Sequence, residues 1–193
     1  MQYRSLKCGQ RISVVGTTGS GKTTTAREIS KRLQLPHIEL DALYWAENWT
    51  GVPEDEFQAR VRAAVEGERW VIDGNYSRIR NLVWGRAETV VFLDYTFWRV
   101  FWQLLRRTMR RSIRREALWS GNREEMRKSF FSRDSILLWM LQTYHRRRKQ
   151  YYGLFQQPEY GHLHVVHLKT PRMTNEWLSN MSLTAKESKN GDR

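Results

Sequence analysis

The sequence contains one cysteine, Cys8, among its 193 residues, so no disulfide can form within the chain. A lack of disulfides is typical of proteins kept in a reducing compartment, and we expect a cytoplasmic protein. Long apolar runs are also missing, because the longest, 136–141, falls far short of the roughly 20 residues that a membrane span needs. The first ten residues contain Arg4, Lys7 and no run of signal-peptide length. We therefore expect a chain without a disulfide scaffold or a membrane anchor.

Acidic residues are scarce in one segment. Residues 99–150 hold 15 Arg and Lys against 4 Asp and Glu, whereas the rest of the chain supplies only +2 of the net charge of +13. Such a local excess predicts an anionic ligand against this segment, the alternative being a solvated charged face. No helix-turn-helix, zinc or RNA-recognition signature accompanies it, so a nucleic-acid partner remains possible without being favoured.

Short β-branched runs alternate with amphipathic stretches along the chain. We expect strands at 11–16, 37–40, 69–73, 89–94 and 162–168. We expect helices at 22–33, 53–65, from 97 to a connection at 118–123, at 134–150 and at 174–181, with a loop at 83–87. Alternation of this kind predicts a parallel sheet with helices on both faces.

Two helical stretches carry clear apolar stripes. From residue 97 the stripe consists of five large side chains, Trp98, Phe101, Trp102, Leu105 and Met109. In the helix expected at 134–150, four residues are predicted to face inward, Leu137, Leu138, Leu141 and Tyr144.

A glycine-rich loop follows the first expected strand. It reads Gly16, Thr17, Thr18, Gly19, Ser20, Gly21, Lys22 and Thr23, with Thr24 next, and matches G-x-x-x-x-G-K-[ST] between a strand and a helix. Glycines let the backbone N–H groups turn toward phosphate oxygens, and the helix that follows adds its own N–H groups. Lys22 is predicted to reach the β- and γ-phosphates, and the Thr23 hydroxyl to ligate Mg²⁺.

A magnesium site also needs a carboxylate at the end of a neighbouring strand, and two are available. Asp73 follows the apolar run WVI and precedes the turn Gly74-Asn75-Tyr76, whereas Asp94 is followed directly by a helix. An aspartate before a helix has the simpler role of a cap. We therefore predict Asp73 as the metal-site carboxylate.

Asp41 ends the second expected strand, at the same edge of the expected sheet as the glycine-rich loop. A carboxylate repels a phosphate monoester but accepts the proton or hydrogen bond of a hydroxyl, so Asp41 is predicted to be catalytic and acceptor-binding. An Asx turn or helix cap is the alternative. The neighbouring rings of Tyr44, Trp45 and Trp49 either stack on a ligand or pack together, and Arg60 is a weaker candidate for contacting a negatively charged acceptor.

The P-loop, the Asp-Gly turn and the arginine-rich helix together resemble the adenylate-kinase-like family of P-loop kinases. The strings LPHIELDALYW, WVIDGNYS and RDSILLW resemble, more closely, the DNA topology modulation proteins (FlaR-like). The resemblance runs from about residue 11 to 177. It implies the strand order 2-3-1-4-5, use of Mg²⁺ and ATP, and a mobile helical lid at about 106–133. The family name implies an effect on DNA.

The resemblance carries over residue by residue. It implies a magnesium role for Asp73 and acceptor contacts for Arg78 and, in the same turn, Asn75 and Tyr76. Catalytic lid contacts are implied for Arg106, Arg110 and Arg133, although Arg107 and Arg111 have the same spacing. This chain departs from the adenylate kinases by lacking their D-G-F-P-R motif and by placing Asp41 where they have a threonine, which argues against AMP as the acceptor.

Six arginines form two i, i+4 stripes on one helix, at 106, 107, 110, 111, 114 and 115. Like charges at this spacing repel each other by a few tenths of a kcal/mol per pair, so we expect an external anion beside them. Triphosphate under a lid is one such anion, and a nucleic-acid backbone is the other.

The sequence thus predicts one α/β P-loop domain at 1–183 and a polar tail at 184–193. Its predicted function is ATP-dependent transfer of phosphate to a small hydroxyl-bearing or nucleotide acceptor. The alternative is a nucleic-acid-binding ATPase or regulator.

Overall fold

The computed structural model describes residues 9–114 and 136–190. Five strands form one sheet, with all pairs parallel and in the order β2-β3-β1-β4-β5. The strands are β1 (Arg11–Gly16), β2 (His37–Glu39), β3 (Trp70–Asp73), β4 (Thr89–Leu93) and β5 (His164–Leu168). The central strands are buried along nearly their whole length because both faces of a parallel sheet are covered by helices.

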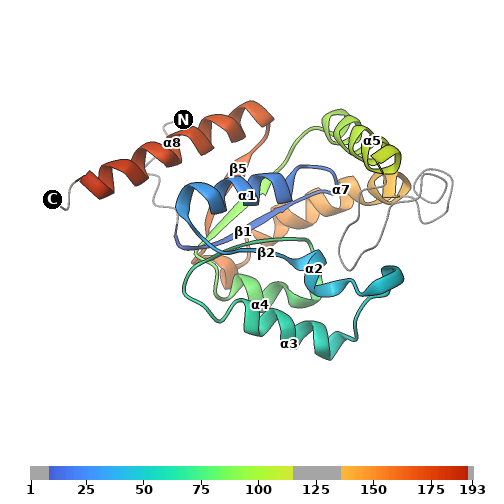
Figure 1. Cartoon of the computed structure of the whole chain (residues 1–193), viewed down its shortest axis with the longest axis horizontal. Coiled ribbons are helices and arrows are strands. Elements are labelled where there is room, and N and C mark those ends of the chain that lie inside the picture. The colour runs from blue at the N-terminus through green and yellow to red at the C-terminus, as the bar shows by residue number, and fades with distance from the viewer. Residues whose placement is uncertain (1–8, 115–135, 191–193) are drawn as a thin grey trace.

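Helices connect the strands and cover both faces of the sheet (Figure 1). The helices are α1 (Lys22–Leu33), α2 (Leu40–Tyr44), α3 (Glu54–Ala64), α4 (Arg80–Trp84), α5 (Phe97–Arg114), α7 (Ile136–Leu154) and α8 (Pro171–Asn190). Three short 3₁₀ turns lie at Glu47–Trp49, Ser77–Ile79 and Pro158–Tyr160. The predicted fold class and strand order are confirmed.

Each face of the sheet has its own core. One core joins α1, α5, α8 and the first half of α7, with Ile29, Leu104 and Met140 fully buried. The other joins α3, α4 and the last part of α7, with Phe57 and Tyr151 buried. Because α7 contributes to both cores, it holds the two layers together.

Several predicted boundaries and faces were wrong. The loop predicted at 83–87 is helical at its start, because α4 extends to Trp84 and both Val83 and Trp84 are buried. Among the inward positions predicted for α7, Tyr144 is buried, but Leu138 and Leu141 are exposed and Met140 is buried instead. The last helix is longer than predicted at both ends. The helix–helix connection predicted at 118–123 lies outside the described residues.

The stripe predicted on α5 is divided: Phe101 packs against the core, whereas Trp98, Trp102 and Met109 are exposed. Trp98 is 67% exposed and Trp102 54% exposed, whereas Val100, Leu104 and Thr108 are fully buried. The buried side chains are smaller because α5 lies directly against the phosphate loop, where a tryptophan would not fit. Sequence periodicity identified an amphipathic helix but favoured the bulkier of its two apolar faces.

No helix within the described residues is both long and apolar enough to cross a lipid bilayer.

Candidate functional site

The glycine-rich loop connects β1 to α1 at the carboxyl edge of the sheet (Figure 1). Gly21 is the residue before α1 and has a φ of 92°, which favours glycine. The side chains of Thr17 and Ser20 are buried, Thr18 is partly buried, and Thr24 is exposed. Inside the loop the Ser20 N–H donates to the Thr17 carbonyl at 3.1 Å.

Gly19 brings the tip of this loop against α5. Its φ is 85°, and a Cβ placed there would lie 2.8 Å from the Cβ of Leu104 and 3.2 Å from the carbonyl oxygen of Val100. Any side chain at this position would separate the loop from the helix. Gly19, at a variable position of the motif, therefore permits a close approach as well as an unusual backbone angle.

Lys22 begins α1, and its Nζ donates to the carbonyl oxygen of Thr17 at 3.2 Å. Burial lowers the pKa of Lys22 to about 8, although the negative charges of Asp73 and Asp41 oppose this shift. The positive charges of Arg147 and Arg107 add to the lowering. A buried cation with two further cations near it indicates a place for an anion, as the sequence motif predicts.

Thr23 and Asp73 lie together as predicted. The Thr23 hydroxyl donates to Asp73 Oδ1 at 2.9 Å, and Asp73 is only 4% exposed at the end of β3. The other carboxylate oxygen, Oδ2, lies 2.8 Å from His37 Nε2. Sequence reasoning missed His37, for which the only available signal was its place in the strand predicted beside Asp73.

Asp41 lies in the first turn of α2, the helix that follows the second strand. The prediction that it ends this strand was therefore wrong. Tyr76 donates its hydroxyl proton to Asp41 Oδ1 at 2.6 Å. Burial raises the pKa of Asp41, and the Tyr76 hydrogen bond and the charge of Lys22 oppose that shift. Burial and the adjacent carboxylate also raise the pKa of Tyr76. Asp41 is thus a mostly buried carboxyl group that responds to the charge of the P-loop lysine.

The other predicted acceptor residues lie in different settings. Asn75 is held by the start of the P-loop, because its amide hydrogen-bonds the backbone of Gly16 and its Oδ1 accepts from Tyr151 at 2.7 Å. Arg60 donates to Glu56 and to the Leu43 carbonyl. Arg78 pairs with Glu54 at 2.7 Å and is largely exposed.

The aromatic residues beside α2 pack on one another. The ring of Tyr44 lies 4.8 Å from that of Trp45, which in turn lies 5.7 Å from the ring of Trp49. Tyr44 also contacts Phe57 and Tyr76, each with ring centroids 5.0 Å apart. Packing is therefore the arrangement observed, and it places Tyr76 against Asp41.

Two arginines face the P-loop from the helices that flank the undescribed segment 115–135. Arg107 on α5 is partly buried, and its charge acts on both Lys22 and Asp41. Arg106 and Arg110 are exposed on another side of α5. Of the two registers left open by the sequence, the one containing Arg107 faces the site, while Arg133 lies outside the described residues.

Arg147 on α7 is a further site residue that the sequence did not single out. Burial lowers its pKa, and its charge reaches Lys22 and Asp41. Its guanidinium lies over the ring of Trp139, 5.6 Å from the centroid, and within the described part of the chain no carboxylate pairs with it. Its place in a run of four basic residues hid it, because charge runs are usually solvated.

Asp94, the other aspartate considered for the metal site, is hydrogen-bonded by residues of α7 and β5 instead. Burial raises its pKa, but hydrogen bonds from Arg148, Tyr152 and His167 outweigh burial and lower it. The three donors lie at 2.6, 2.7 and 2.9 Å. With its oxygens occupied by α7 and β5, Asp94 joins those elements to β4.

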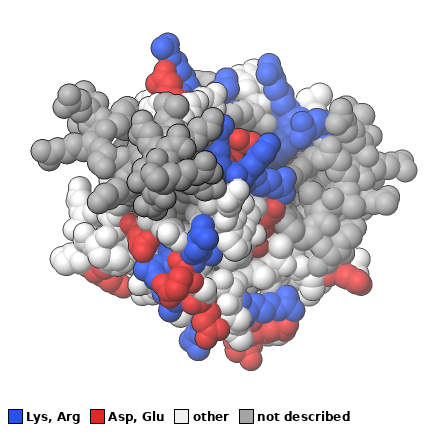
Figure 2. Space-filling model, turned by 60° about the vertical axis from the view of Figure 1, so that its left-hand side comes forward, with Lys and Arg blue, Asp and Glu red and all other residues white. Residues whose placement is uncertain are grey.

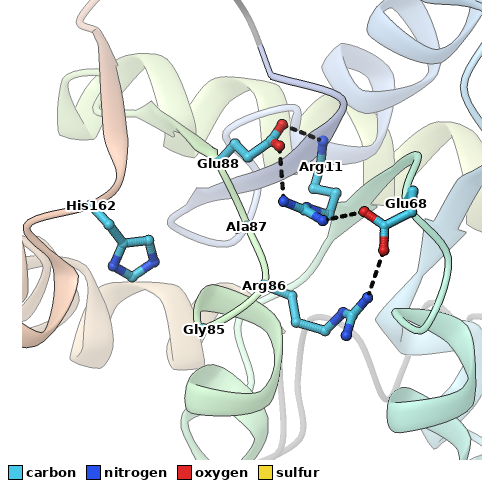
Figure 3. A pocket seen from close by; sticks show the side chains of 7 residues that line it. All are labelled: Arg11, Glu68, Gly85, Arg86, Ala87, Glu88 and His162. Carbon is cyan, nitrogen blue, oxygen red and sulfur yellow. Dashed lines mark hydrogen bonds and ion pairs between the residues drawn. The ribbon is translucent and has the colours of Figure 1, made fainter.

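A hollow of about 480 Å³ lies at the opposite edge of the sheet, and Figure 3 shows its lining. Its charged groups neutralise one another, since Arg11 pairs with Glu68 at 2.5 Å and with Glu88 at 2.9 Å, and Arg86 pairs with Glu68 at 3.4 Å. None of the predicted phosphate-loop residues contributes to it. This hollow is therefore separate from the candidate site.

The residues at the P-loop fit a magnesium ion. Mg²⁺ prefers oxygen ligands and keeps several waters and substrate phosphates, so it requires few protein ligands. Thr23 and Asp73 supply oxygens of this kind beside Lys22. No cluster of three or more His, Cys, Asp and Glu suited to holding a metal occurs among the described residues.

Comparison with known proteins gives partial matches in sequence and whole-chain matches in structure. Residues 12–94 match the family described as ATPase family associated with various cellular activities (AAA). A bifunctional pantoate ligase/cytidylate kinase from Synechococcus sp. (strain JA-2-3B'a(2-13)) is 28% identical over 83 residues, which are 41% of this chain and 15% of that enzyme. The chain thus corresponds to a small part of that relative.

Two solved structures resemble nearly the whole chain. A gluconokinase from Sinorhizobium meliloti 1021 has a TM-score of 0.51 at 18% identity, covering 96% of this chain and 98% of its own. A shikimate kinase from Bacteroides thetaiotaomicron has a TM-score of 0.53 at 16% identity, covering 91% and 98%.

Sheet order, loop and structural neighbours define the class: this is an α/β protein with the P-loop NTPase fold. Within that class, its structural likeness is to kinases of small molecules. The resemblance to DNA topology modulation proteins stays a prediction.

Proposed function

We propose that this chain is an ATP-dependent phosphotransferase whose acceptor is a small molecule with a hydroxyl group. The observation that carries this proposal is the position of Asp41: a mostly buried carboxyl group, held by Tyr76 at 2.6 Å, whose pKa responds to Lys22 of the phosphate loop. A kinase needs a base for its acceptor hydroxyl, and a hydrolase needs a group that orients the attacking water, so the acceptor assay below separates the two. The raised pKa of Asp41 also suits a base, because it brings the carboxylate closer to the pH of the reaction.

In the proposed reaction Asp41 accepts the proton of the acceptor hydroxyl. The acceptor oxygen bonds to the γ-phosphorus as the bond from that phosphorus to the β,γ-bridging oxygen breaks, and ADP leaves. Lys22, Arg107 and Arg147 stabilise the negative charge on the transferred group. Thr23 and Asp73 would hold Mg²⁺, which neutralises phosphate charge when bound.

The test is a coupled assay of ADP release across hydroxylated metabolites, nucleosides and nucleotides with Mg·ATP. We expect at least one hydroxyl-bearing compound to raise ADP release well above the rate with ATP alone, and the phosphorylated product to be detectable by mass spectrometry. ADP release stimulated by DNA and by none of these compounds would favour the nucleic-acid-dependent ATPase instead. Among the described residues on the face shown in Figure 2, acidic side chains lie among the basic ones.

Arg107 and Arg106 form a matched pair that tests which side of α5 serves the transferred phosphate. Replacing Arg107 with alanine is expected to lower kcat by about ten- to a hundredfold, the usual effect of losing a hydrogen bond to a charged group. Arg106→Ala, on the exposed side, is expected to stay within about twofold of the wild type. Steady-state kinetics with the acceptor found above measure both. Equal losses from the two variants would contradict the assigned register.

A further inference from the structure

Among the described residues, His37 is the side chain that hydrogen-bonds Oδ2 of Asp73, the candidate metal-site carboxylate. The two oxygens of Asp73 each have one partner: Oδ1 accepts from Thr23 at 2.9 Å, and Oδ2 lies 2.8 Å from His37 Nε2. The His37 side chain is 13% exposed and that of Asp73 is 5% exposed. This hydrogen bond is therefore shielded from water along most of its surface.

The strand pairing explains how His37 reaches Asp73. β2 and β3 run parallel with His37 opposite Val71 and Glu39 opposite Asp73. Side chains alternate between the faces of a sheet, so His37, Glu39 and Asp73 share one face. His37 extends diagonally toward the carboxyl end of β3, and this direction leads to the P-loop.

The partners also fix the proton on the ring. An ionised carboxylate only accepts hydrogen bonds, so Nε2 carries the hydrogen that is donated to Asp73. The other ring nitrogen, Nδ1, faces Glu39 at 4.0 Å. Glu39 is itself paired with Arg27 at 2.6 Å, and it thus remains in place beside the ring.

We propose that His37 is a positioning residue for the metal site: it holds Asp73 so that Oδ1 faces Thr23. This inference rests on the proposed use of Mg·ATP. With its hydrogen donated to Asp73, the Thr23 hydroxyl directs its lone pairs away from that carboxylate, where a cation can bind them. Without the His37 donor, Asp73 Oδ2 is buried and unsatisfied, and the carboxylate turns toward another partner. Loss of such an outer partner weakens metal binding by about ten- to a hundredfold in other sites.

The alternative is that His37 only anchors β2, a strand of three residues, to the sheet. The two roles differ in what they affect. If His37 only anchors β2, replacing it changes the stability of the whole chain and leaves the Mg²⁺ affinity of the folded protein unchanged. If His37 positions Asp73, replacing it weakens Mg²⁺ binding and leaves nucleotide binding without metal unchanged.

The experiment measures ADP binding by calorimetry in EDTA and then titrates Mg²⁺ into the protein–ADP complex. We expect His37→Leu to weaken Mg²⁺ binding about ten- to a hundredfold while ADP binding in EDTA stays within about twofold. His37→Gln places an amide N–H near the position of Nε2, so it is expected to recover most of the affinity. Asp73→Asn should lose affinity as His37→Leu does, and combining it with His37→Leu should add little.

Wild-type Mg²⁺ affinity in His37→Leu would overturn the assignment, as would equal losses in the Leu and Gln variants. If His37→Leu affects nothing while Asp73→Asn weakens Mg²⁺ binding, only the role of His37 fails. If Asp73→Asn also has no effect, the proposed metal site fails with it.

A spectroscopic measurement gives a second readout of the same role on the wild-type chain. The five histidines are distinguished by their ring ¹⁵N signals, with His37→Gln identifying the one of interest. The His37 ring is expected to be protonated at Nε2, and its signal should shift when Mg²⁺ is added to the ADP complex. A His37 signal unchanged by Mg²⁺ would overturn the inference.

Discussion

Lys22→Ala is expected to lower kcat/KM for phosphoryl transfer by about a hundred- to a thousandfold or more, because the variant lacks the cation that contacts the transferred phosphate. The fold should survive. Lys22 makes one hydrogen bond, to the Thr17 carbonyl, and burial of its charge lowers its pKa to about 8. A lysine with a lowered pKa disfavours the folded state at neutral pH, so removing its charge costs the unliganded protein little stability. Kinetics and a thermal melt of the same sample measure both effects.

Lys31→Ala is the matched control, since Lys31 is exposed in the last turn of the same helix. It should leave both activity and melting temperature close to those of the wild type.

The lowered pKa of Lys22 has a further consequence for the wild type. Above pH 8 part of the unliganded protein carries neutral Lys22, and binding a polyphosphate restores its charge. Nucleotide binding there should take up protons, visible by calorimetry in buffers of different ionisation enthalpy. Near-normal turnover by Lys22→Ala would refute the P-loop assignment.

Asp41→Asn is expected to reduce kcat by about 10²–10⁴, the usual effect of removing a positioned base, with little change in Mg·ATP affinity. Asparagine keeps the size of the side chain and an oxygen that accepts from Tyr76, so the local packing is retained. Because burial raises the pKa of Asp41 and only the carboxylate takes a proton, wild-type kcat should rise as pH increases through that raised pKa. This limb of the pH profile should vanish in the variant.

Asp55→Asn on the exposed side of α3 is the matched control and should leave kcat unchanged. Tyr76→Phe removes the hydrogen bond to Asp41 while keeping the ring packed. It should raise the pKa of Asp41 further and shift the acid limb of the profile upward. A parallel loss of Mg·ATP binding in Asp41→Asn would instead assign Asp41 to the nucleotide site or to the fold.

The predictable parts of this molecule are those set by neighbouring residues. The P-loop lies within one short segment, and its glycines, lysine and threonine have their roles because of local backbone geometry. Asp73 was identifiable because it ends an apolar strand before a glycine turn. The fold followed from the alternation of strands and helices, together with a family resemblance for the strand order.

The residues that escaped prediction depend on contacts between distant segments. His37 reaches Asp73 only because β2 and β3 pair in one particular register. Arg107 and Arg106 are adjacent in sequence, and only the packing of α5 against Gly19 decides which of them faces the phosphate loop. Arg147 is distinguished from its basic neighbours by burial, which depends on how α7 crosses the site.

The hydrogen bonds that Asp94 accepts affect the order in which a newly synthesised chain can fold. Residues 11–93 already contain four adjacent strands, β2-β3-β1-β4, but Asp94 receives its bonds from residues 54, 58 and 73 positions later. A nascent chain that has left the ribosome only as far as β4 therefore holds a carboxylate that cannot yet be buried. Synthesis of α7 and β5 supplies its partners and covers the open edge of β4. Contacts this distant in sequence form late and slowly, so we expect this edge of the sheet to be completed only after β5 has been translated.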